Sequence, residues 1–274
     1  MLVLGATGYV GGRLVSTLLD AGYRVGVLSR SPGRTDRYAW SDRVRSFTGD
    51  VLESDTLAPA FDGCDAVYYL VHSIGASDDF AATEATAARN VRDAADRAGL
   101  RRIVYLGGMG RGDALSTHLA SRHQVGEILA SGRTPTTELR AAVIIGSGSI
   151  SFEMLRYLTE VLPAMITPRW VRTKCQPIAI RDVLVYLTGV LEDPETVDRV
   201  LEIGGPDVVT YAEMMQTYAE VAGLPRRIIV PVPLLSPKLS SRWVGLVTPL
   251  PTRIAVPLID ALRFEVVMTD PEID

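Results

Sequence analysis

Short apolar runs alternate with longer amphipathic segments through roughly the first 150 residues of the chain. This pattern predicts strands at residues 1–4, 23–28, 44–51, 66–71, 102–106 and 137–145. It predicts helices at residues 13–20, 80–98 and 117–131. The run at residues 66–71 is almost wholly apolar, as is typical of a parallel strand that is buried on both faces. The alternation therefore predicts a doubly wound α/β domain of the Rossmann type over residues 1–150, with helices on both faces of a parallel sheet.

The pattern becomes less regular after residue 150, where prolines and tryptophans accumulate. Here we predict a helix at residues 151–161, a strand–helix pair from residue 176 and a strand at residues 199–203. A further helix begins at Thr210, because its hydroxyl and Glu213 three residues later have the spacing of a capping box. We expect residues 151–274 to form a smaller α/β substrate lobe that is interleaved with the first domain. The chain ends without a recognisable final element, which is the pattern of a truncated chain.

The first strand leads directly into three glycines at three-residue spacing, Gly5, Gly8 and Gly11, and a helix-like stretch follows. Glycines let the backbone turn tightly and approach a pyrophosphate closely, while the helix N-terminus points free N–H groups at that anion. The flanking strands and helix give the motif its expected context. A tight turn without a ligand is the alternative. The sequence predicts a bound dinucleotide, with further contacts from Thr7, Tyr9 and Val10.

The end of the second strand indicates which dinucleotide is preferred. A site for NAD(H) usually has an Asp or Glu about 20 residues beyond the first glycine, where it binds the ribose 2′-hydroxyl. Here the strand ends in Ser29 and Arg30, with no carboxylate at that position. An arginine can pair with a 2′-phosphate through two hydrogen bonds, and a hydroxyl can add another. We expect NADP(H) to be preferred and NAD(H) to be possible, unless Arg30 is only a solvated loop charge.

Composition excludes several classes of partner. The chain has 274 residues, 47% hydrophobic and 22% charged, as in an ordinary globular protein. Its net charge of −4 provides no general basic field, so no nucleic-acid partner is expected. Cys64 and Cys175 stand apart, and the pattern predicts neither a disulfide framework nor a metal site. Because neither a signal peptide nor a membrane span is predicted, we expect a cytoplasmic location.

These features resemble the short-chain dehydrogenase/reductase superfamily. More narrowly, the chain is similar to the atypical NAD(P)H-binding subgroup related to NmrA-like and sugar-epimerase-like proteins. The resemblance extends over essentially the whole chain and rests on the glycine motif, residues 49–51 and 68–73, Arg140, and residues 176–182 and 202–207. It implies a substrate at the carboxyl-terminal edge of the sheet. The residues that it implies beside the cofactor are Asp50 and Val51 at the adenine, Leu70, Val71 and His72 at the nicotinamide, and Gly107 and Gly108 in place of a catalytic serine.

The tyrosine and lysine that support reduction in the superfamily are missing. There the lysine lies four residues after the tyrosine and lowers its pKa, so that the phenol can transfer a proton. The chain has only two lysines, Lys174 and Lys238, and neither follows a tyrosine at this spacing. At the expected place, on the helix after the fifth strand, His118 and Arg122 are four residues apart and would project from one face.

His118 is the candidate proton donor, because an unperturbed imidazole has a pKa of roughly 6.5. Arg122 could bind the ribose hydroxyls of the cofactor, but it cannot release a proton at any accessible pH. The alternative is a polar helix start in which His118 has no catalytic role.

Cationic and hydrogen-bonding residues gather at residues 169–176. They predict either a clamp for a polar or anionic substrate or a solvated basic loop. The full set of expected substrate contacts is Ser73, Met109, Arg140, Arg172, Lys174 and Gln176. The apolar, proline-rich segment at residues 228–262, which contains Trp243, packs a small lobe or else offers a surface to a second copy, another protein or lipid.

The sequence therefore favours an NADPH-dependent oxidoreductase that acts on a hydrophobic carbonyl compound or enone. The hydride would come from the nicotinamide and the proton from His118 or water. Two alternatives remain, namely a regulatory protein that senses NADP(H) and a structural protein that keeps the cofactor for stability. The missing tyrosine and lysine favour these alternatives, whereas the substrate-lobe segments favour an enzyme.

Overall fold

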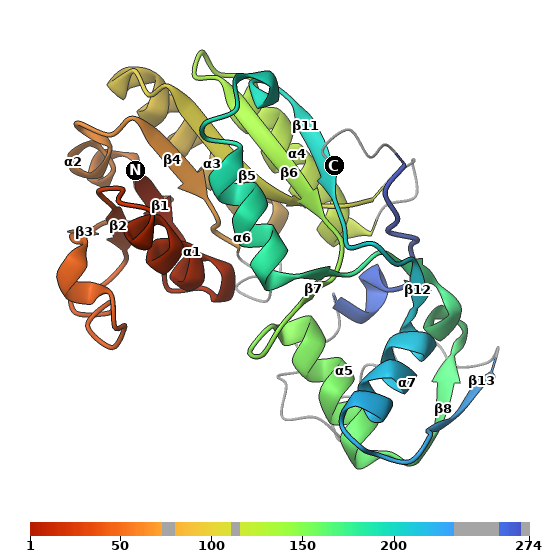
Figure 1. Cartoon of the computed structure of the whole chain (residues 1–274). Helices are drawn as coiled ribbons and strands as arrows, with labels where there is room; N and C mark the ends of the chain where they lie inside the picture. Colours follow the sequence, from red (N-terminus) through yellow and green to blue (C-terminus); the bar gives the residue numbers. More distant parts are fainter. Residues whose placement is uncertain (73–79, 111–115, 233–257, 270–274) are drawn as a thin grey trace.

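The computed structural model of the chain (Figure 1) describes residues 1–72, 80–110, 116–232 and 258–269. Its centre is a sheet of seven parallel strands in the order β11-β6-β5-β4-β1-β2-β3. These strands are β1 (Leu2–Leu4), β2 (Gly26–Ser29), β3 (Arg45–Thr48), β4 (Ala66–Tyr69), β5 (Arg102–Gly108), β6 (Thr136–Ala141) and β11 (Val200–Ile203). The expected parallel α/β sheet is confirmed.

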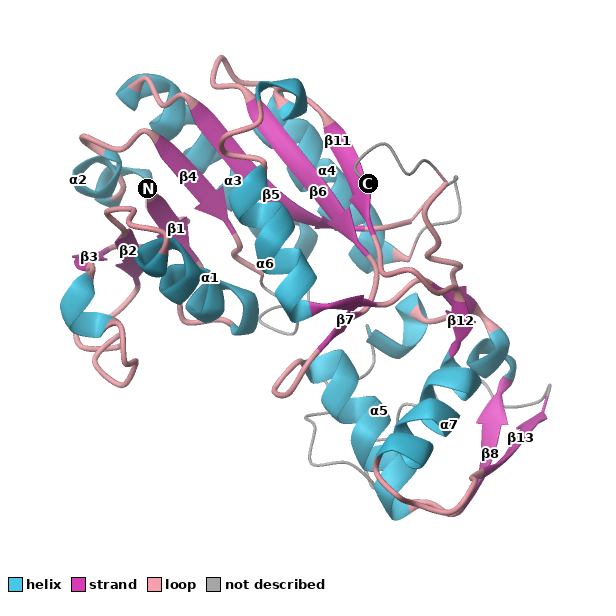
Figure 2. Cartoon of the chain, viewed as in Figure 1, coloured by secondary structure: helices cyan, strands magenta, loops and turns pink. Residues whose placement is uncertain are grey.

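Helices cover both faces of this sheet (Figure 2). One face carries α1 (Tyr9–Asp20) and α6 (Ile180–Gly189), and the other carries α2 (Ala58–Phe61), α3 (Phe80–Ala98) and α4 (Thr117–Ala130). Side chains alternate between the two faces along each strand. Val3 accordingly packs into the core beneath α1 and α6, while Leu2 and Leu4 pack into the core beneath α3 and α4. Two buried faces explain why β1 and β4 are apolar or aromatic at every position.

The order of the strands reverses beside β1. From β1 the chain builds the sheet outward through β2 to β3, and it then returns to place β4 on the other side of β1. Ligands of open α/β sheets bind outside the carboxyl ends of the strands at such a reversal. The segments that follow Leu4 and Tyr69 therefore border the expected crevice.

The elements after residue 150 are divided between the sheet and a smaller lobe. Both α6 and β11 belong to the sheet layers, because α6 packs against α1 and β11 pairs with β6. The lobe contains α5 (Ile150–Val161), α7 (Tyr211–Val221), the parallel pair β8 (Ala164–Pro168) and β13 (Ile228–Val232), and the antiparallel pair β9 (Lys174–Cys175) and β12 (Val209–Thr210). Thr210 and Glu213 form the predicted capping box at the start of α7. Short 3-10 turns are η1 (Ser41–Arg43), η2 (Ser54–Thr56), η3 (Arg169–Arg172) and η4 (Pro194–Thr196).

The strand predicted at residues 137–145 is interrupted, and this part of the prediction is wrong. The last bond between β5 and β6 runs from the N–H of Met109 to the carbonyl of Ala141. Beyond it the chain changes partner, because the N–H of Ile178 donates to the carbonyl of Val143. The following residues form β7 (Ile144–Ile145), which pairs with β10 (Ile178–Ala179) outside the central sheet. The first helix also differs, since it begins at Tyr9 rather than at residue 13.

Some predictions fall on residues outside the described ranges. These include Ser73, Trp243 and most of the apolar segment at 228–262, of which the structure describes residues 228–232 and 258–262. A partner surface on this segment and a cytoplasmic location stay predictions. In the part of the chain that is described, no helix is both long and apolar enough to span a bilayer.

Candidate active site

The turn after β1 has room only for glycine at two of its three motif positions. Gly5 has a φ of +86°, and a Cβ atom there would lie 2.6 Å from the carbonyl oxygen of Leu70. A Cβ atom on Gly11 would overlap the carbonyl oxygen of Gly5, so α1 lies directly against the turn. Gly8 differs, because its φ of −83° is open to any residue and a Cβ would meet only the Gly5 carbonyl oxygen, at 3.1 Å. Packing thus excludes other residues at Gly5 and Gly11, whereas a side chain at Gly8 would require only a small shift of the Gly5 carbonyl.

The start of α1 provides donors for an anion. Gly8 is the N-cap of this 12-residue helix and has no side chain with which to cap it, and the first turn contains no acidic residue. The first N–H groups of a helix have no partner within the helix, and the positive end of its dipole attracts negative charge. The geometry therefore fits a pyrophosphate at this turn. Thr7 and Val10 flank Gly8 here, as the motif implied.

Tyr38, which the sequence reasoning missed, fixes the glycine turn from outside. Its hydroxyl donates a 2.8 Å hydrogen bond to the carbonyl oxygen of Thr7, and its ring stacks on Trp40 with centroids 4.7 Å apart. The guanidinium of Arg37 donates in turn to the Tyr38 hydroxyl at 3.1 Å. Tyr38 lies in a polar connection between β2 and β3 that has no periodic pattern, so the sequence offered no signal for this contact.

Tyr9 makes contacts within the protein. The guanidinium carbon of Arg13 lies 4.1 Å from the centroid of the Tyr9 ring, and a Cβ on Gly146 would overlap the Tyr9 hydroxyl. Arg13 also donates to the carbonyl of Ser147 at 2.9 Å. The Tyr9 hydroxyl is buried and has no hydrogen-bond partner among the described residues. Tyr9 therefore holds the segment after β7 against α1, and a contact between Tyr9 and the cofactor stays a prediction.

The segments after β2 and β3 hold the residues expected beside the adenosine. Arg30 is exposed directly after β2, and the Ser29 hydroxyl donates to the carbonyl of Ser31 at 2.9 Å. The Asp50 carboxylate accepts from the N–H of Leu52 at 3.0 Å. The carbonyl of Val51 accepts from the side chain of Asn90 at 2.9 Å. No acidic residue thus stands at the end of β2, where Ser29 and Arg30 lie. Asp50 stabilises its own turn.

A buried polar cluster lies beside the end of β4. His72 follows Leu70 and Val71, and its Nδ1 is 2.7 Å from a carboxylate oxygen of Glu84 on α3. The other oxygen of Glu84 accepts from the hydroxyl of Ser121 on α4 at 2.7 Å. Glu84 is only 2% exposed, whereas the His72 side chain is 31% exposed. Burial lowers the pKa of His72, and the hydrogen bond to Glu84 opposes this shift.

His118 and Arg122 do project toward this cluster from α4. The His118 ring lies beside that of His72, with centroids 4.9 Å apart, and its buried Nδ1 has no partner among the described residues. Burial, followed by the neighbouring His72 and Arg122, lowers the pKa of His118 to about 3. Arg122 is 9% exposed, donates to the carbonyl of Leu106 and lies over the ring of Tyr105. His118 is therefore neutral at pH 7, and Arg122 supports the end of β5.

The two glycines at the carboxyl end of β5 have a packing role. A Cβ on Gly107 would lie 2.6 Å from a carboxylate oxygen of Glu138, and one on Gly108 would lie 3.1 Å from the side chain of Leu119. Glu138 is 4% exposed and pairs with Arg140, whose Nε lies 2.8 Å from it. Arg140, an expected substrate contact, therefore has a partner within the protein. Met109, another one, is 1% exposed and belongs to the core of the lobe.

The cluster at residues 169–176 does not act as one unit. Arg172 and Lys174 are exposed. The Gln176 amide bridges the backbone instead, because its Nε2 donates to the carbonyl of Gly205 at 2.7 Å and its oxygen accepts from the N–H of Met268 at 3.0 Å. Of the two explanations, the solvated loop describes Arg172 and Lys174 better, and a substrate clamp there stays a prediction.

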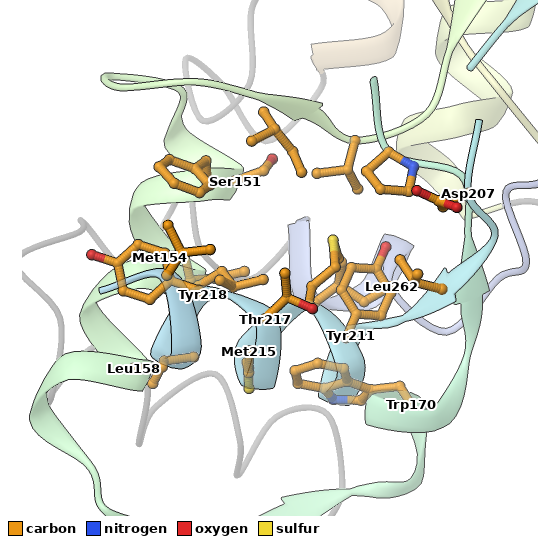
Figure 3. A pocket seen from close by; sticks show the side chains of 18 residues that line it. Ser151, Met154, Leu158, Trp170, Asp207, Tyr211, Met215, Thr217, Tyr218 and Leu262 are labelled. Atoms are coloured by element: carbon orange, nitrogen blue, oxygen red, sulfur yellow. The ribbon is translucent and has the colours of Figure 1, made fainter. Parts of the chain in front are cut away.

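A cavity of about 420 Å³ lies between α5 and α7 of the lobe (Figure 3). It is lined mainly by apolar and aromatic side chains, with Ser151 and Asp207 among the few polar ones. The lining residues are Val143, Ile145, Ser151, Phe152, Met154, Leu155, Leu158, Trp170, Pro177, Asp207, Val209, Tyr211, Met214, Met215, Thr217, Tyr218, Val221 and Leu262. Because these residues come from widely separated segments, each with ordinary core periodicity, no local sequence signal identified the cavity.

Part of the cavity wall comes from the segment that follows the carboxyl end of β6. Val143 and Ile145, on its wall, directly follow the carboxyl end of β6. Met109, directly after β5, packs in the same core cluster as the lining residues Met154 and Leu155. An apolar cavity with a few polar groups is typical of small-molecule sites. Among the described residues, no group of three or more His, Cys, Asp or Glu side chains could hold a metal ion.

Comparison with known proteins places these features in a family. Residues 5–148, more than half of the chain, match the family model described as NAD(P)H-binding. The 3 beta-hydroxysteroid dehydrogenase/Delta 5→4-isomerase of Mycobacterium tuberculosis is 30% identical over 115 residues, which cover 38% of this chain and 30% of that protein. Cinnamoyl-CoA reductase 1 of Oryza sativa subsp. japonica is 30% identical over 114 residues, covering 39% of this chain and 34% of that protein. The matched stretch spans about a third of the length of these curated relatives.

A solved structure resembles nearly the whole chain. The crystal structure of Citrobacter sp. triphenylmethane reductase complexed with NADP(H) superposes on this chain with a TM-score of 0.77. The match covers 98% of this chain and 92% of the reductase chain, at 21% sequence identity. An identity this low shows a shared fold. The family match and this neighbour agree with the resemblance inferred from the glycine motif.

Proposed function

Because this chain belongs to the NAD(P)H-binding family, we propose that it is an NADP(H)-dependent oxidoreductase of the atypical short-chain dehydrogenase/reductase type. Its proposed substrate is a hydrophobic carbonyl compound or enone. The cavity of about 420 Å³ carries the substrate part of this proposal, since it is apolar and part of its wall follows the carboxyl end of β6. A pocket of this character accepts an uncharged substrate more readily than a charged one.

The residues around the turn fit a dinucleotide. The Gly8 N-cap and the uncapped first turn of α1 would hold the pyrophosphate, and Arg30 with Ser29 would bind the 2′-phosphate. The nicotinamide end would lie beside Leu70 and His72, in the crevice between the ends of β1 and β4. When bound, the nicotinamide supplies or accepts a hydride.

Turnover tests this proposal directly. NADPH oxidation would be followed in single-turnover reactions with a panel of apolar ketones, enones and quinones, alongside charged analogues of the same size. We expect oxidation with apolar members of the panel and little with the charged ones, because desolvating a charge in the cavity is costly. Oxidation confined to the charged analogues would contradict the assigned substrate class.

One observation favours the non-catalytic alternatives. Arg122, which stands where the superfamily has its lysine, already binds the carbonyl of Leu106 and stacks on Tyr105. A sensor or a structural protein would bind NADPH as tightly as an enzyme without oxidising it on any acceptor. Tight binding combined with no turnover over the whole panel would therefore support that alternative.

A further inference from the structure

Two carboxyl groups near the carboxyl ends of the central strands are almost fully buried. Glu138 on β6 is 4% exposed and Glu84 on α3 is 2% exposed. Burying a carboxylate is costly unless hydrogen bonds and opposite charge compensate it. Glu138 pairs with Arg140, a permanent cation. Glu84 instead forms a hydrogen bond with the imidazole of His72, a group that can take up and release a proton.

His72 lies where a reacting substrate is expected. It is two residues beyond Leu70, whose carbonyl oxygen touches the glycine turn at Gly5. These two segments border the crevice between β1 and β4, at the reversal of strand order. The side chain of His72 is 31% exposed, whereas its partner Glu84 is enclosed. The pair therefore has one accessible member and one buried member, as in an acid–base group with a residue that orients it.

We propose that His72 is the acid–base residue of the reaction and that Glu84, held by Ser121, is the residue that positions its imidazole. This inference rests on the proposed function. It assigns to His72 the proton transfer for which the sequence suggested His118.

The pair fixes which nitrogen of His72 reacts. With Glu84 accepting the Nδ1–H, the neutral ring has its lone pair on Nε2. In oxidation of an alcohol, Nε2 takes the hydroxyl proton as the carbon gives its hydride to the oxidised cofactor. In reduction, the imidazolium form of His72 would donate its Nε2 proton to the carbonyl oxygen as the carbonyl carbon gains the hydride with its two electrons. The imidazole then recovers its proton from water, so the reaction balances.

The groups that face His72 make it better suited to this role than His118. They are Glu84 from α3 and His118 and Arg122 from α4. Among the described residues the buried Nδ1 of His118 has no hydrogen-bond partner to orient its ring, and its pKa is lowered to about 3. For His72, burial and Arg122 lower the pKa while Glu84 raises it. A lowered pKa keeps His72 neutral at pH 7, where it can act as a base, and carbonyl reduction accelerates as pH falls toward that pKa.

Imidazole NMR tests the pair without any turnover. The chain has three histidines, so single substitutions to Gln assign each ring, including the control residue His123. We expect neutral His72 to carry its proton on Nδ1, and we expect its pKa to fall in Glu84→Gln because the charged partner is lost. Saturation with NADPH should also perturb His72 Nε2 more than any atom of His123. An Nε2–H tautomer, or a His72 pKa that does not respond to Glu84→Gln, would overturn the assignment.

Kinetics separate a proton role from a structural one. Reduction of a ketone by hydride leaves an alkoxide and so needs a proton in the same step, whereas an uncharged quinone leaves a stabilised phenolate that takes its proton from water afterwards. In His72→Gln we expect the ratio of ketone to quinone reduction to fall by about 100-fold or more, the usual scale of acid–base catalysis. His123→Gln should leave the ratio unchanged. The pH dependence of ketone reduction should disappear in His72→Gln.

The outcomes distinguish this inference from the proposed function. Equal loss of ketone and quinone reduction in His72→Gln would mean that His72 only supports the structure. Full ketone reduction in that variant would refute the inference while leaving the proposed function intact. No NADPH oxidation by the wild-type protein with any acceptor would refute the proposed function and, with it, a reacting role for His72.

Discussion

Substitution of Arg140 by methionine tests whether this residue serves the fold or the substrate. The sequence predicted a substrate contact, but Arg140 Nε lies 2.8 Å from the carboxylate of Glu138. That carboxylate is 4% exposed and is enclosed by two glycines, because a Cβ atom on Gly107 or on Gly126 would overlap it. Arg140→Met keeps most of the aliphatic stem and removes the charge that compensates Glu138. We therefore expect a loss of stability rather than a selective loss of substrate affinity.

The magnitude follows from the burial of the two partners. Removing one member of a fully buried ion pair costs about 3–5 kcal/mol, because the other charge remains buried alone. The Arg140 side chain is 21% exposed, so water screens part of the interaction. We expect the free energy of unfolding to fall by about 2–4 kcal/mol, which for a chain of this size lowers Tm by about 4–15 °C.

Thermal and urea unfolding of three variants would measure this loss. The control is Arg133→Met, because Arg133 is 82% exposed and lies 3.9 Å from Asp96, a surface pair worth less than about 1 kcal/mol. Adding Glu138→Gln to Arg140→Met removes the stranded charge and should restore at least half of the lost stability. A Tm in Arg140→Met equal to that of the control would refute the reasoning and return Arg140 to the list of substrate contacts.

Three other substitutions test the cofactor and substrate assignments. Arg30→Asp should reverse the ratio of the Kd values for NADPH and NADH, since a carboxylate repels a 2′-phosphate and binds a 2′-hydroxyl; an unchanged ratio would mean that Arg30 is only a surface charge. Tyr38→Phe removes the 2.8 Å hydrogen bond to Thr7, so calorimetry should show an NADPH Kd raised roughly fivefold, equivalent to about 1 kcal/mol. An unaltered Kd would mean that the contact between Tyr38 and Thr7 does not contribute to cofactor binding. Met215→Trp adds volume to the wall of the cavity and should raise KM for bulky apolar substrates while the NADPH Kd stays constant; an unchanged KM would place the substrate elsewhere.

The sheet could be predicted because its strands are buried on both faces. Val67, Tyr68 and Tyr69 of β4 are each at most 1% exposed. A short run of consecutive apolar and aromatic residues is typical of a strand inside a parallel sheet. The interruption between β6 and β7 could not be predicted in the same way. Residues 141–145 form an unbroken apolar run, so the sequence gives no sign of the interruption. The pairing of Ile144 with Ile178 depends on where β10 lies in space.

The candidate site was predictable only where a motif encodes backbone geometry. Gly5 and Gly11 make the turn recognisable in the sequence, because no other residue type fits at these two positions. Glu84 gives no such signal, since a glutamate in an alanine-rich helix has the pattern of a solvated charge, and its burial depends on contacts with His72 and Ser121 from other elements. The pKa of His118 likewise depends on its surroundings. Burial lowers it to about 3, whereas a free imidazole has a pKa of roughly 6.5.

Calorimetric titration of Gly8→Val with NADPH tests the central claim most directly. The backbone of Gly8, with φ −83° and ψ 174°, suits valine, so the fold should survive while the close approach of a pyrophosphate is blocked. The matched control is Gly189→Val, at the end of α6, where a Cβ atom meets nothing within 4 Å. We predict that wild-type protein and the control bind NADPH and that Gly8→Val retains its Tm but does not bind. Equal NADPH affinity in all three proteins would contradict a dinucleotide site at the glycine turn.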